Sequence, residues 1–315
     1  MAASTHRPLS FRGSTKTPEA EEDIDLYFHR PLAYLVARAF VHTPVTPNQI
    51  TFISAVLGVA AGVFLAIAQP WSLATGAALI VASTVLDCAD GQLARMKGTS
   101  SLWGRLYDAV ADNVVGFVTF LGAAICILRM HGFSIPLILY ILVALVCGNY
   151  HTMLFDYYKQ AWLLMVLPDK GEFEDVPTVE AKLARLRREK AHWFQRLAVW
   201  LQLSHHLSQA SIARRLNPAN ILHREEFPYS PEGAAEYRAR NTRLLRAWSF
   251  FGPGWHFFLV ALAAALGGQF LWYCFVRVVV LNVVLAIILP LQRRATRETV
   301  RRISPARPAG GESAT

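Results

Sequence analysis

Six long apolar runs limit what this chain can fold into. They cover residues 50–68, 71–86, 114–128, 135–147, 247–268 and 270–291. Each run can cross about 30 Å of hydrocarbon once flanking helical residues are added. Because backbone N–H and C=O groups do not stay unpaired in lipid, such segments span a membrane as α-helices. The sequence therefore predicts an all-α, polytopic membrane protein with six transmembrane helices.

Composition agrees with a membrane protein. Of the 315 residues, 54% are hydrophobic and only 17% are charged, which is unusual for a soluble domain of this length. The first fifty residues are polar and lack a short apolar core, so no signal peptide is expected. The four cysteines show no spacing typical of a disulfide or a zinc site, and we expect each to be a small buried residue.

Positive charge is unevenly distributed along the chain. The formal net charge is +9, and Lys and Arg are concentrated after the second, fourth and sixth runs. By the positive-inside rule these segments and both termini face the cytoplasm. Topology and anionic membrane lipids thus explain the charge, and nucleic acid is not an expected partner.

Four aspartates lie where the second and third predicted helices meet. Asp87 and Asp90 share one helix face, Asp108 and Asp112 share another, and the two antiparallel helices can bring the pairs together. Four carboxylates near the inner membrane edge repel strongly unless cations neutralise them. Carboxylate-only ligation favours Mg²⁺ or Mn²⁺, and a pair of such ions is typical of sites that activate phosphoryl groups.

Small and basic residues accompany the aspartates. Gly91 and Ala94 remove side-chain bulk one turn from the carboxylates, and Gly104 does so on the next helix. Arg95 carries a planar cation suited to phosphate. Arg105 has three possible roles: to assist Arg95, to bind the acceptor, or to mark the cytoplasmic boundary. This set predicts a phosphate-binding surface beside the metal site.

Together these residues form one pattern, Asp87-x2-Asp90-Gly91-x2-Ala94-Arg95-x8-Gly104-x3-Asp108-x3-Asp112. The pattern resembles the full signature of the CDP-alcohol phosphotransferase family, with all eight positions present at the family's spacing. The aspartate-rich motif of prenyl synthases has a different spacing. The resemblance implies a six-helix membrane core, usually a homodimer, that transfers a substituted phosphate group from a CDP-alcohol to an acceptor hydroxyl and releases CMP.

The resemblance also implies a role for each aspartate. Asp87, Asp90 and Asp108 would hold the metal ions, two Mg²⁺ or Mn²⁺, that grip the pyrophosphate of the CDP-linked donor. Asp112 would be the general base that deprotonates the acceptor hydroxyl, and it would also contact the metal. The competing interpretation is that all four are solvated charges at the inner membrane boundary.

The segment at the start of the first span has two interpretations. Thr46, Pro47 and Gln49 are typical of a capped helix start. Family members often carry a similar Thr-Pro-Asn element near the cytidine nucleotide, so Asn48 and Thr51 are also predicted to contact the donor. The segment can serve both purposes, as a helix cap and as a contact to the nucleotide.

The remaining segments are predicted from composition and periodicity. We expect a mobile segment at 1–23, an amphipathic juxtamembrane helix at 24–45, the first four spans with the motif at 46–163, a basic cytoplasmic insertion at 164–246, the last two spans at 247–292, and a basic mobile tail at 293–315. Within the insertion, residues 178–203 are predicted to form one basic helix and residues 217–241 a loop with short helical pieces.

Three polar residues inside predicted spans have open roles. Asn149 and His151 either bind an acceptor head group or bond to another helix, because intramembrane polar groups usually face the protein interior. Arg277 begins in the outer half of its span, so a structural role is expected there.

The preferred function is phospholipid head-group synthesis in a membrane expected to be the bacterial inner membrane. The donor would be CDP-diacylglycerol and the acceptor a small polar alcohol such as glycerol phosphate, inositol or inositol phosphate. The alternative pairs a soluble CDP-alcohol, such as CDP-choline or CDP-ethanolamine, with a lipid acceptor. From other classes, a divalent-cation transporter would need acids along a continuous polar route, and an inactive scaffold would not need intact aspartates.

Overall fold

The computed structural model describes residues 11, 17–99, 102–167, 176–218 and 230–303, and this part of the chain contains no strand. Its α-helices are α2 (Arg30–Phe40), α3 (Pro47–Ile67), α4 (Pro70–Lys97), α5 (Leu102–His131), α6 (Ile135–Val166), α7 (Val176–Arg188), α8 (Trp193–Leu216), α9 (Pro231–Trp248), α10 (Pro253–Ala265), α11 (Phe270–Phe275) and α12 (Leu281–Ile303). Short turns of other helix types are η1 (Asp25–His29), η3 (Ser249–Phe251) and η4 (Val276–Val280). Six helical stretches are long and apolar enough to cross a membrane, which confirms the predicted all-α, multi-pass class.

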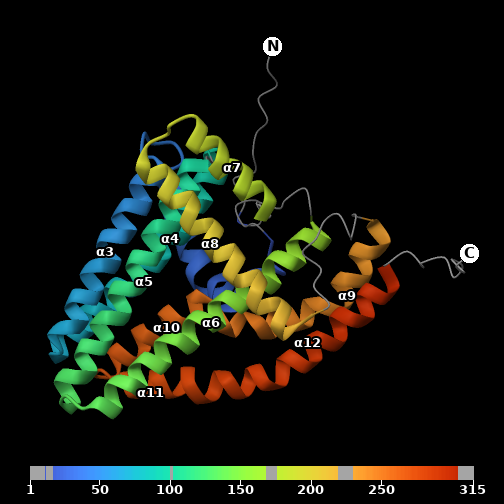
Figure 1. The fold of residues 1–315 in the computed structure, drawn as a ribbon. Coiled ribbons are helices and arrows are strands. Elements are labelled where there is room, and N and C mark those ends of the chain that lie inside the picture. The colour runs from blue at the N-terminus through green and yellow to red at the C-terminus, as the bar shows by residue number, and fades with distance from the viewer. Residues whose placement is uncertain (1–10, 12–16, 100–101, 168–175, 219–229, 304–315) are drawn as a thin grey trace, which may run out of the picture.

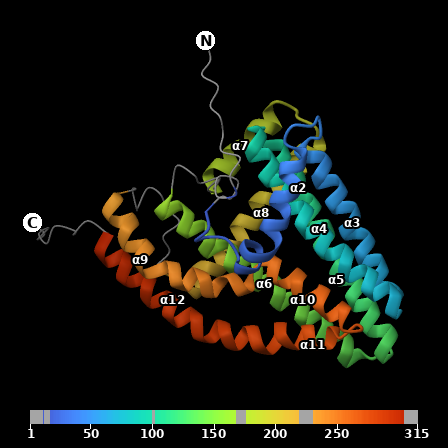
Figure 2. The ribbon, with the colours of Figure 1, turned by 180° about the vertical axis from the view of Figure 1, so that it is seen from behind.

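The membrane helices form two groups that diverge from a common end. Figure 1 shows α3, α4 and α5 side by side in one group and α6, α9 and α12 in the other, and Figure 2 shows the same separation from behind. Helix α10 packs against α4 and so connects the groups. The α7–α8 hairpin lies at the open end, with α8 crossing toward the second group.

Local sequence explains where the first membrane helices begin and end. The Thr46 side chain accepts a hydrogen bond from the Gln49 amide at 3.3 Å, and the Gln49 side chain accepts one from the Thr46 amide at 2.8 Å. This confirms the predicted capping box. Helix α4 ends at Gly98, which adopts a left-handed φ of 68°. Nearby, the Lys97 ammonium donates to the carbonyls of Thr43 and Val45 and ties this end of α4 to the α2–α3 connection.

The predicted fifth span is not a single helix over 247–268. Helix α9 ends at Trp248, the η3 turn follows, and α10 begins at Pro253 after an extended Gly252. Proline at the first position of a helix forces the preceding residue out of the helical region, so the chain bends here. The stretch Pro231–Ala265 is long enough and has an apolar enough window to cross a membrane, and its first helix includes residues 231–241, which the sequence analysis placed in a loop.

The basic segment 178–203 is two helices rather than one. Lys190 adopts a left-handed φ of 50°, and the Ala191 amide donates to the Leu186 carbonyl at 3.0 Å to close the turn. The two helices then bury Val179 and Leu183 of α7 against Ala198 and Val199 of α8. A hairpin covers these apolar side chains, which a single straight helix would leave on one open face.

Residues 17–23 pack against the rest of the protein and bury Thr17, Ala20, Glu21 and Glu22, although the sequence analysis expected residues 1–23 to be mobile. Glu21 pairs with Arg30 at 2.7 Å, Asp23 pairs with Arg246, and Glu22 accepts a hydrogen bond from the Trp255 amide at 3.1 Å. These contacts tie the N-terminal segment to the second helix group. Residues 1–10, 12–16 and 304–315 lie outside the described part of the chain, and residues 293–303 continue helix α12.

Helices α3 and α5 touch through their backbones. A Cβ atom added at Gly122 would lie 2.1 Å from the Gly62 carbonyl oxygen, and one added at Gly58 would lie 2.4 Å from a Val115 methyl group. The close approach therefore requires glycine, and the Gly58-x3-Gly62 pair packs within the chain. This contact helps to set the position of α5, which carries two of the four aspartates.

We predict that Gly122→Ala destabilises the protein, because an added methyl group would push α3 and α5 apart. The expected loss is about 1–3 kcal/mol, seen as a lower thermal unfolding temperature of the detergent-solubilised protein. Gly116→Ala on the same helix is the matched control, since its Cβ would meet only a Phe257 carbon at 3.9 Å. Equal unfolding temperatures for the two variants would contradict this account of the contact.

The buried carboxyl group of Glu22 generates a pH prediction. Burial and the neighbouring Asp25 carboxylate raise the pKa of Glu22 well above its usual value. The folded chain then keeps a proton that the unfolded chain releases, so this contribution to stability is present below the ordinary glutamate pKa and is lost as pH rises toward the raised one.

Glutamine stays neutral at every pH. The unfolding temperature of Glu22→Gln should therefore rise relative to that of the unmodified protein as pH increases from about 5 to about 8. The free-energy difference should grow by no more than about 1.4 kcal/mol per pH unit. Thermal unfolding of both proteins in one detergent over this pH range checks the prediction. If the unfolding temperature of Glu22→Gln does not rise relative to that of the unmodified protein as pH increases, Glu22 is ionised in the folded state.

Candidate active site

Three aspartates from two helices meet at one point. Asp87 and Asp90 of α4 and Asp108 of α5 each contribute a carboxylate oxygen, and these oxygens lie within 4.8 Å of one another. Asp90 is 5% exposed, and the other two are partly buried. Oxygen ligands at this separation suit hard divalent ions such as Mg²⁺ and Mn²⁺. The donor set therefore fits the metal that the aspartate spacing indicates.

Asp112 lies next to this group but is not one of the three. Its carboxyl group is within hydrogen-bonding reach of the Asp87 side chain, and both residues line the same cavity. Asp112 is one helical turn from Asp108 on α5. The arrangement thus places a fourth carboxyl group beside the three candidate ligands and on the cavity wall.

Thr51 holds Asp90 from the opposite side. Its hydroxyl lies in hydrogen-bonding contact with the Asp90 carboxylate and also 3.2 Å from the Pro47 carbonyl oxygen. Thr51 is 3% exposed. A hydroxyl engaged in this way orients a carboxylate, as partners of metal ligands commonly do.

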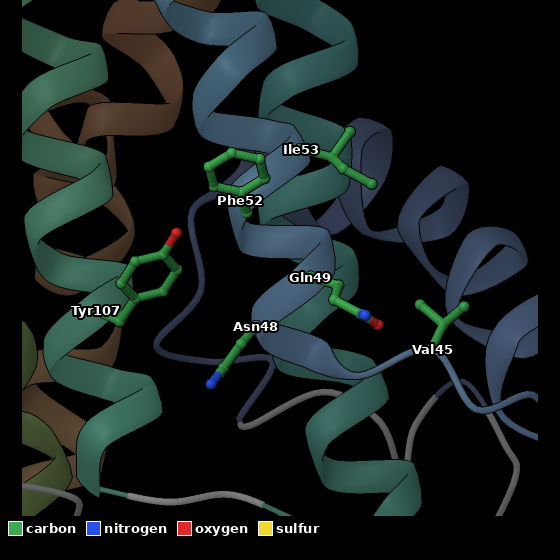
Figure 3. A pocket seen from close by; sticks show the side chains of 6 residues that line it. All are labelled: Val45, Asn48, Gln49, Phe52, Ile53 and Tyr107. Atoms are coloured by element: carbon green, nitrogen blue, oxygen red, sulfur yellow. The ribbon is translucent and has the colours of Figure 1, made fainter.

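Asn48 lines a different hollow. Figure 3 shows an opening between α3 and α5 formed by Val45, Asn48, Gln49, Phe52, Ile53 and Tyr107, with a volume of about 540 Å³. Within it, the Asn48 amide points away from α3 while Gln49 points toward Val45. The two donor-binding candidates of the Thr-Pro-Asn segment therefore have different surroundings, since Thr51 contacts Asp90.

The predicted phosphate-binding residues remain close to the aspartates. A Cβ added at Gly91 would lie 3.4 Å from a guanidinium nitrogen of Arg95, so this cation folds back along α4 toward the acids. Ala94 lies in the last turn of α4, where its carbonyl oxygen accepts the Thr99 amide at 3.0 Å. Gly104 lies on the first turn of α5 and is partly buried. The Arg105 side chain is outside the described part of the chain.

A cavity of about 490 Å³ extends from the acids into the protein, between α4, α5, α6, α10 and η4. Asn149 of α6 lines it, as does Arg277 at the opposite end. His151 is fully buried instead, with its Nε2 atom 3.4 Å from the Asn282 side-chain oxygen. Of the two proposed acceptor contacts, Asn149 opens on the cavity and His151 bonds to another helix.

Several cavity residues escaped the sequence analysis. Asp25 of η1, His256 of α10 and Arg277 of η4 all line the cavity. Asp25 is also bonded to His29 at 2.8 Å. Each is a single polar residue with no spacing partner, so no motif marks it. Arg277 is noted in the sequence analysis as a charge inside an apolar run, but with an expected structural role rather than a place on the cavity wall.

Comparison with known proteins finds a similarity in the part of the chain that carries this site. The family model described as CDP-alcohol phosphatidyltransferase matches residues 44–161, which contain α3, α4, α5 and all four aspartates. The chain is also 35% identical over 79 residues to a phosphatidylinositol phosphate synthase of Corynebacterium glutamicum. That match covers 25% of this chain and 35% of the relative, so the chain spans about a third of the relative's length. Residues 44–161, the part of the chain that carries the four aspartates, are therefore similar to the CDP-alcohol phosphatidyltransferase family.

Proposed function

We propose that this protein is an integral membrane transferase that moves a substituted phosphate group from a CDP-alcohol to an acceptor hydroxyl and releases CMP. The observation that carries the proposal is the meeting of Asp87, Asp90 and Asp108 beside a cavity that Asp87 and Asp112 line. The match of residues 44–161 to the CDP-alcohol phosphatidyltransferase model supports it. The basic segments, which by the positive-inside rule face the cytoplasm, support an active site on that side.

Asp87, Asp90 and Asp108 would hold the divalent ions, either Mg²⁺ or Mn²⁺. When bound, such ions neutralise the pyrophosphate charge and polarise the reacting phosphorus. Thr51 keeps the Asp90 carboxylate oriented through its hydroxyl. Arg95 supplies a fixed cation for a phosphate oxygen, Gly91, Ala94 and Gly104 allow close approach to the backbone, and Asn48 contacts the nucleotide.

Asp112 would act as the general base. It takes the proton of the acceptor hydroxyl, the acceptor oxygen forms a new bond to the β-phosphorus, and the bond from that phosphorus to CMP breaks. The proton ends on Asp112 and the electron pair of the broken bond leaves with CMP. Its place beside Asp87 and on the cavity wall supports this role, because an acceptor in the cavity is within reach of both groups.

For the substrates, we favour CDP-diacylglycerol as donor and a small polar alcohol as acceptor. The cavity of about 490 Å³ has polar groups at both ends and suits an acceptor of that kind. The similar protein from C. glutamicum is a phosphatidylinositol phosphate synthase, which supports the same choice. A soluble CDP-alcohol with a lipid acceptor is the second candidate. We also propose a homodimer in a bacterial inner membrane.

The cavity argues against a cation transporter. Its far end is occupied by the buried cation Arg277, which would repel a divalent ion that had passed the aspartates. Transport would instead require acids or other oxygen ligands along the whole route.

The function is tested by incubating the full-length protein in detergent or vesicles with Mg²⁺ or Mn²⁺ and a panel of CDP-alcohols and acceptors. CMP and the mass of the lipid product are followed together. We expect CMP release that depends on the metal and on one acceptor class. Tight binding of CDP-alcohols with no CMP release from any pair would favour the inactive scaffold.

Asp112→Asn should lower the rate of CMP release by about 10²-fold to 10⁴-fold, because the variant lacks a proton acceptor. Donor binding should survive, since the three other aspartates remain. Asp156→Asn is the matched control: Asp156 accepts a hydrogen bond from Gln209 at 2.9 Å, and an asparagine oxygen can accept it too. A wild-type rate in Asp112→Asn would refute the base assignment.

Thr51→Val should weaken Mn²⁺ binding by about 10-fold to 100-fold, because Asp90 loses the hydroxyl that orients it. Thr51→Ser keeps the hydroxyl and should bind Mn²⁺ nearly as well as the unmodified protein. Titration of the metal-free protein, followed by the electron paramagnetic resonance of free Mn²⁺, measures both. Equal affinities for the two variants would mean that Thr51 does not support the metal site.

A further inference from the structure

A buried cation faces the cavity at the end opposite the aspartates. Arg277 and His256 line this end, and each is only 7% exposed. Arg277 comes from the η4 turn and His256 from α10. The cavity therefore has acids at one end and basic groups at the other.

Arg277 has no carboxylate counterpart among the ion pairs of the described residues. Its Nε atom is buried without a hydrogen-bond partner, and the guanidinium lies 5.4 Å from the Phe120 ring centroid and 5.2 Å from that of Tyr273. Aromatic faces compensate only part of the desolvation of a buried charge. An anion placed in the cavity would supply the missing interaction.

His256 has hydrogen-bonding capacity that the protein does not use. Both ring nitrogens are buried without a partner in the described structure. The ring stacks on His151 with centroids 6.4 Å apart, and His151 is held in turn by Asn282. Buried polar atoms are normally paired, so two unpaired nitrogens on a cavity wall indicate a ligand that carries oxygen atoms.

The backbone is shaped to hold Arg277 in place. Residues Val276–Val280 form a π-helical turn, a rare form that is frequent at functional sites. Asn282 donates to the carbonyls of Arg277 and Val278 at 3.3 and 2.9 Å. On the facing helix, a Cβ added at Gly148 would lie 1.2 Å from a guanidinium nitrogen, so the position of the cation requires glycine there.

The cavity has the length of a small substituted alcohol. It follows α5 from Asp112 to Phe120, and the rise of an α-helix makes this about 12 Å. Phe120 contacts the Arg277 guanidinium. A molecule with its reacting hydroxyl at Asp112 can therefore place an anionic group near Arg277 and His256.

We propose that Arg277 and His256 bind a phosphate group carried by the acceptor alcohol, so that the enzyme selects phosphorylated acceptors over neutral ones. This inference rests on the proposed function, and it chooses glycerol phosphate or inositol phosphate over free inositol. The bound phosphate does not react. Arg277 acts as a specificity residue that fixes the far end of the acceptor while its hydroxyl lies at Asp112.

The test compares acceptors that differ only in the phosphate group, glycerol 3-phosphate with glycerol and inositol phosphate with inositol, in the full-length protein with CDP-diacylglycerol and Mn²⁺. Arg277→Gln should lower kcat/KM for the phosphorylated acceptors by about 30-fold or more, mainly through KM, as expected for a lost charge-assisted contact. Reaction with the neutral acceptors and the KM for donor should change little. Arg277→Lys should recover part of the loss, and Gly148→Ala should resemble Arg277→Gln. Arg129→Gln, at an exposed arginine that contacts the Ile67 carbonyl, is the control.

A second readout avoids catalysis. Inorganic phosphate should raise the thermal unfolding temperature of the metal-free protein and of Arg129→Gln, but not that of Arg277→Gln. Equal losses for phosphorylated and neutral acceptors would make Arg277 structural and overturn the inference. So would CMP release with neutral or lipid alcohols but with no phosphorylated acceptor. In both cases the proposed transfer reaction would stand, whereas absence of CMP release from every pair, with the phosphate effect intact, would overturn only the proposed function.

Discussion

Mutual repulsion of carboxylates in a low-dielectric setting is the constraint on which this structure depends. Three carboxylate oxygens, from Asp87 and Asp90 of α4 and Asp108 of α5, lie within 4.8 Å of one another. Such a group is costly unless cations neutralise it. The glycine contact between α3 and α5 and the hydroxyl of Thr51 keep the acids in this arrangement. The fold therefore holds three acids in an arrangement that a divalent cation would neutralise.

The same cavity carries the opposite charge at its other end. Arg277 and His256 are buried there with unused hydrogen-bonding atoms, about 12 Å along α5 from Asp112. A cavity with carboxyl groups at one end and unpaired basic groups at the other suits a ligand that is polar at both ends. In the proposed reaction that ligand is an acceptor with a hydroxyl at the acids and a phosphate at Arg277.

Local and periodic features could be predicted from the sequence. The length of the apolar runs predicts six helices that could span a membrane. Helical spacing predicts that the aspartate pairs meet, and residue type predicts the Thr46–Gln49 capping box. Features that depend on contacts between distant segments could not. The chain turns at Lys190 because the apolar faces of α7 and α8 pack against each other. Residues 17–23 pack against the protein because Glu21 pairs with Arg30 and Asp23 pairs with Arg246. Asp25, His256 and Arg277 reach the cavity through such tertiary packing, which no spacing records.

Location of the metal tests the central claim most directly. An experimental structure of the full-length protein with Mn²⁺ and a CDP-alcohol, with manganese identified by anomalous scattering, would show where the ions bind. The account predicts manganese between Asp87, Asp90 and Asp108, in contact with the pyrophosphate of the donor. Manganese elsewhere, or a donor bound with these three carboxylates free of metal, would contradict it.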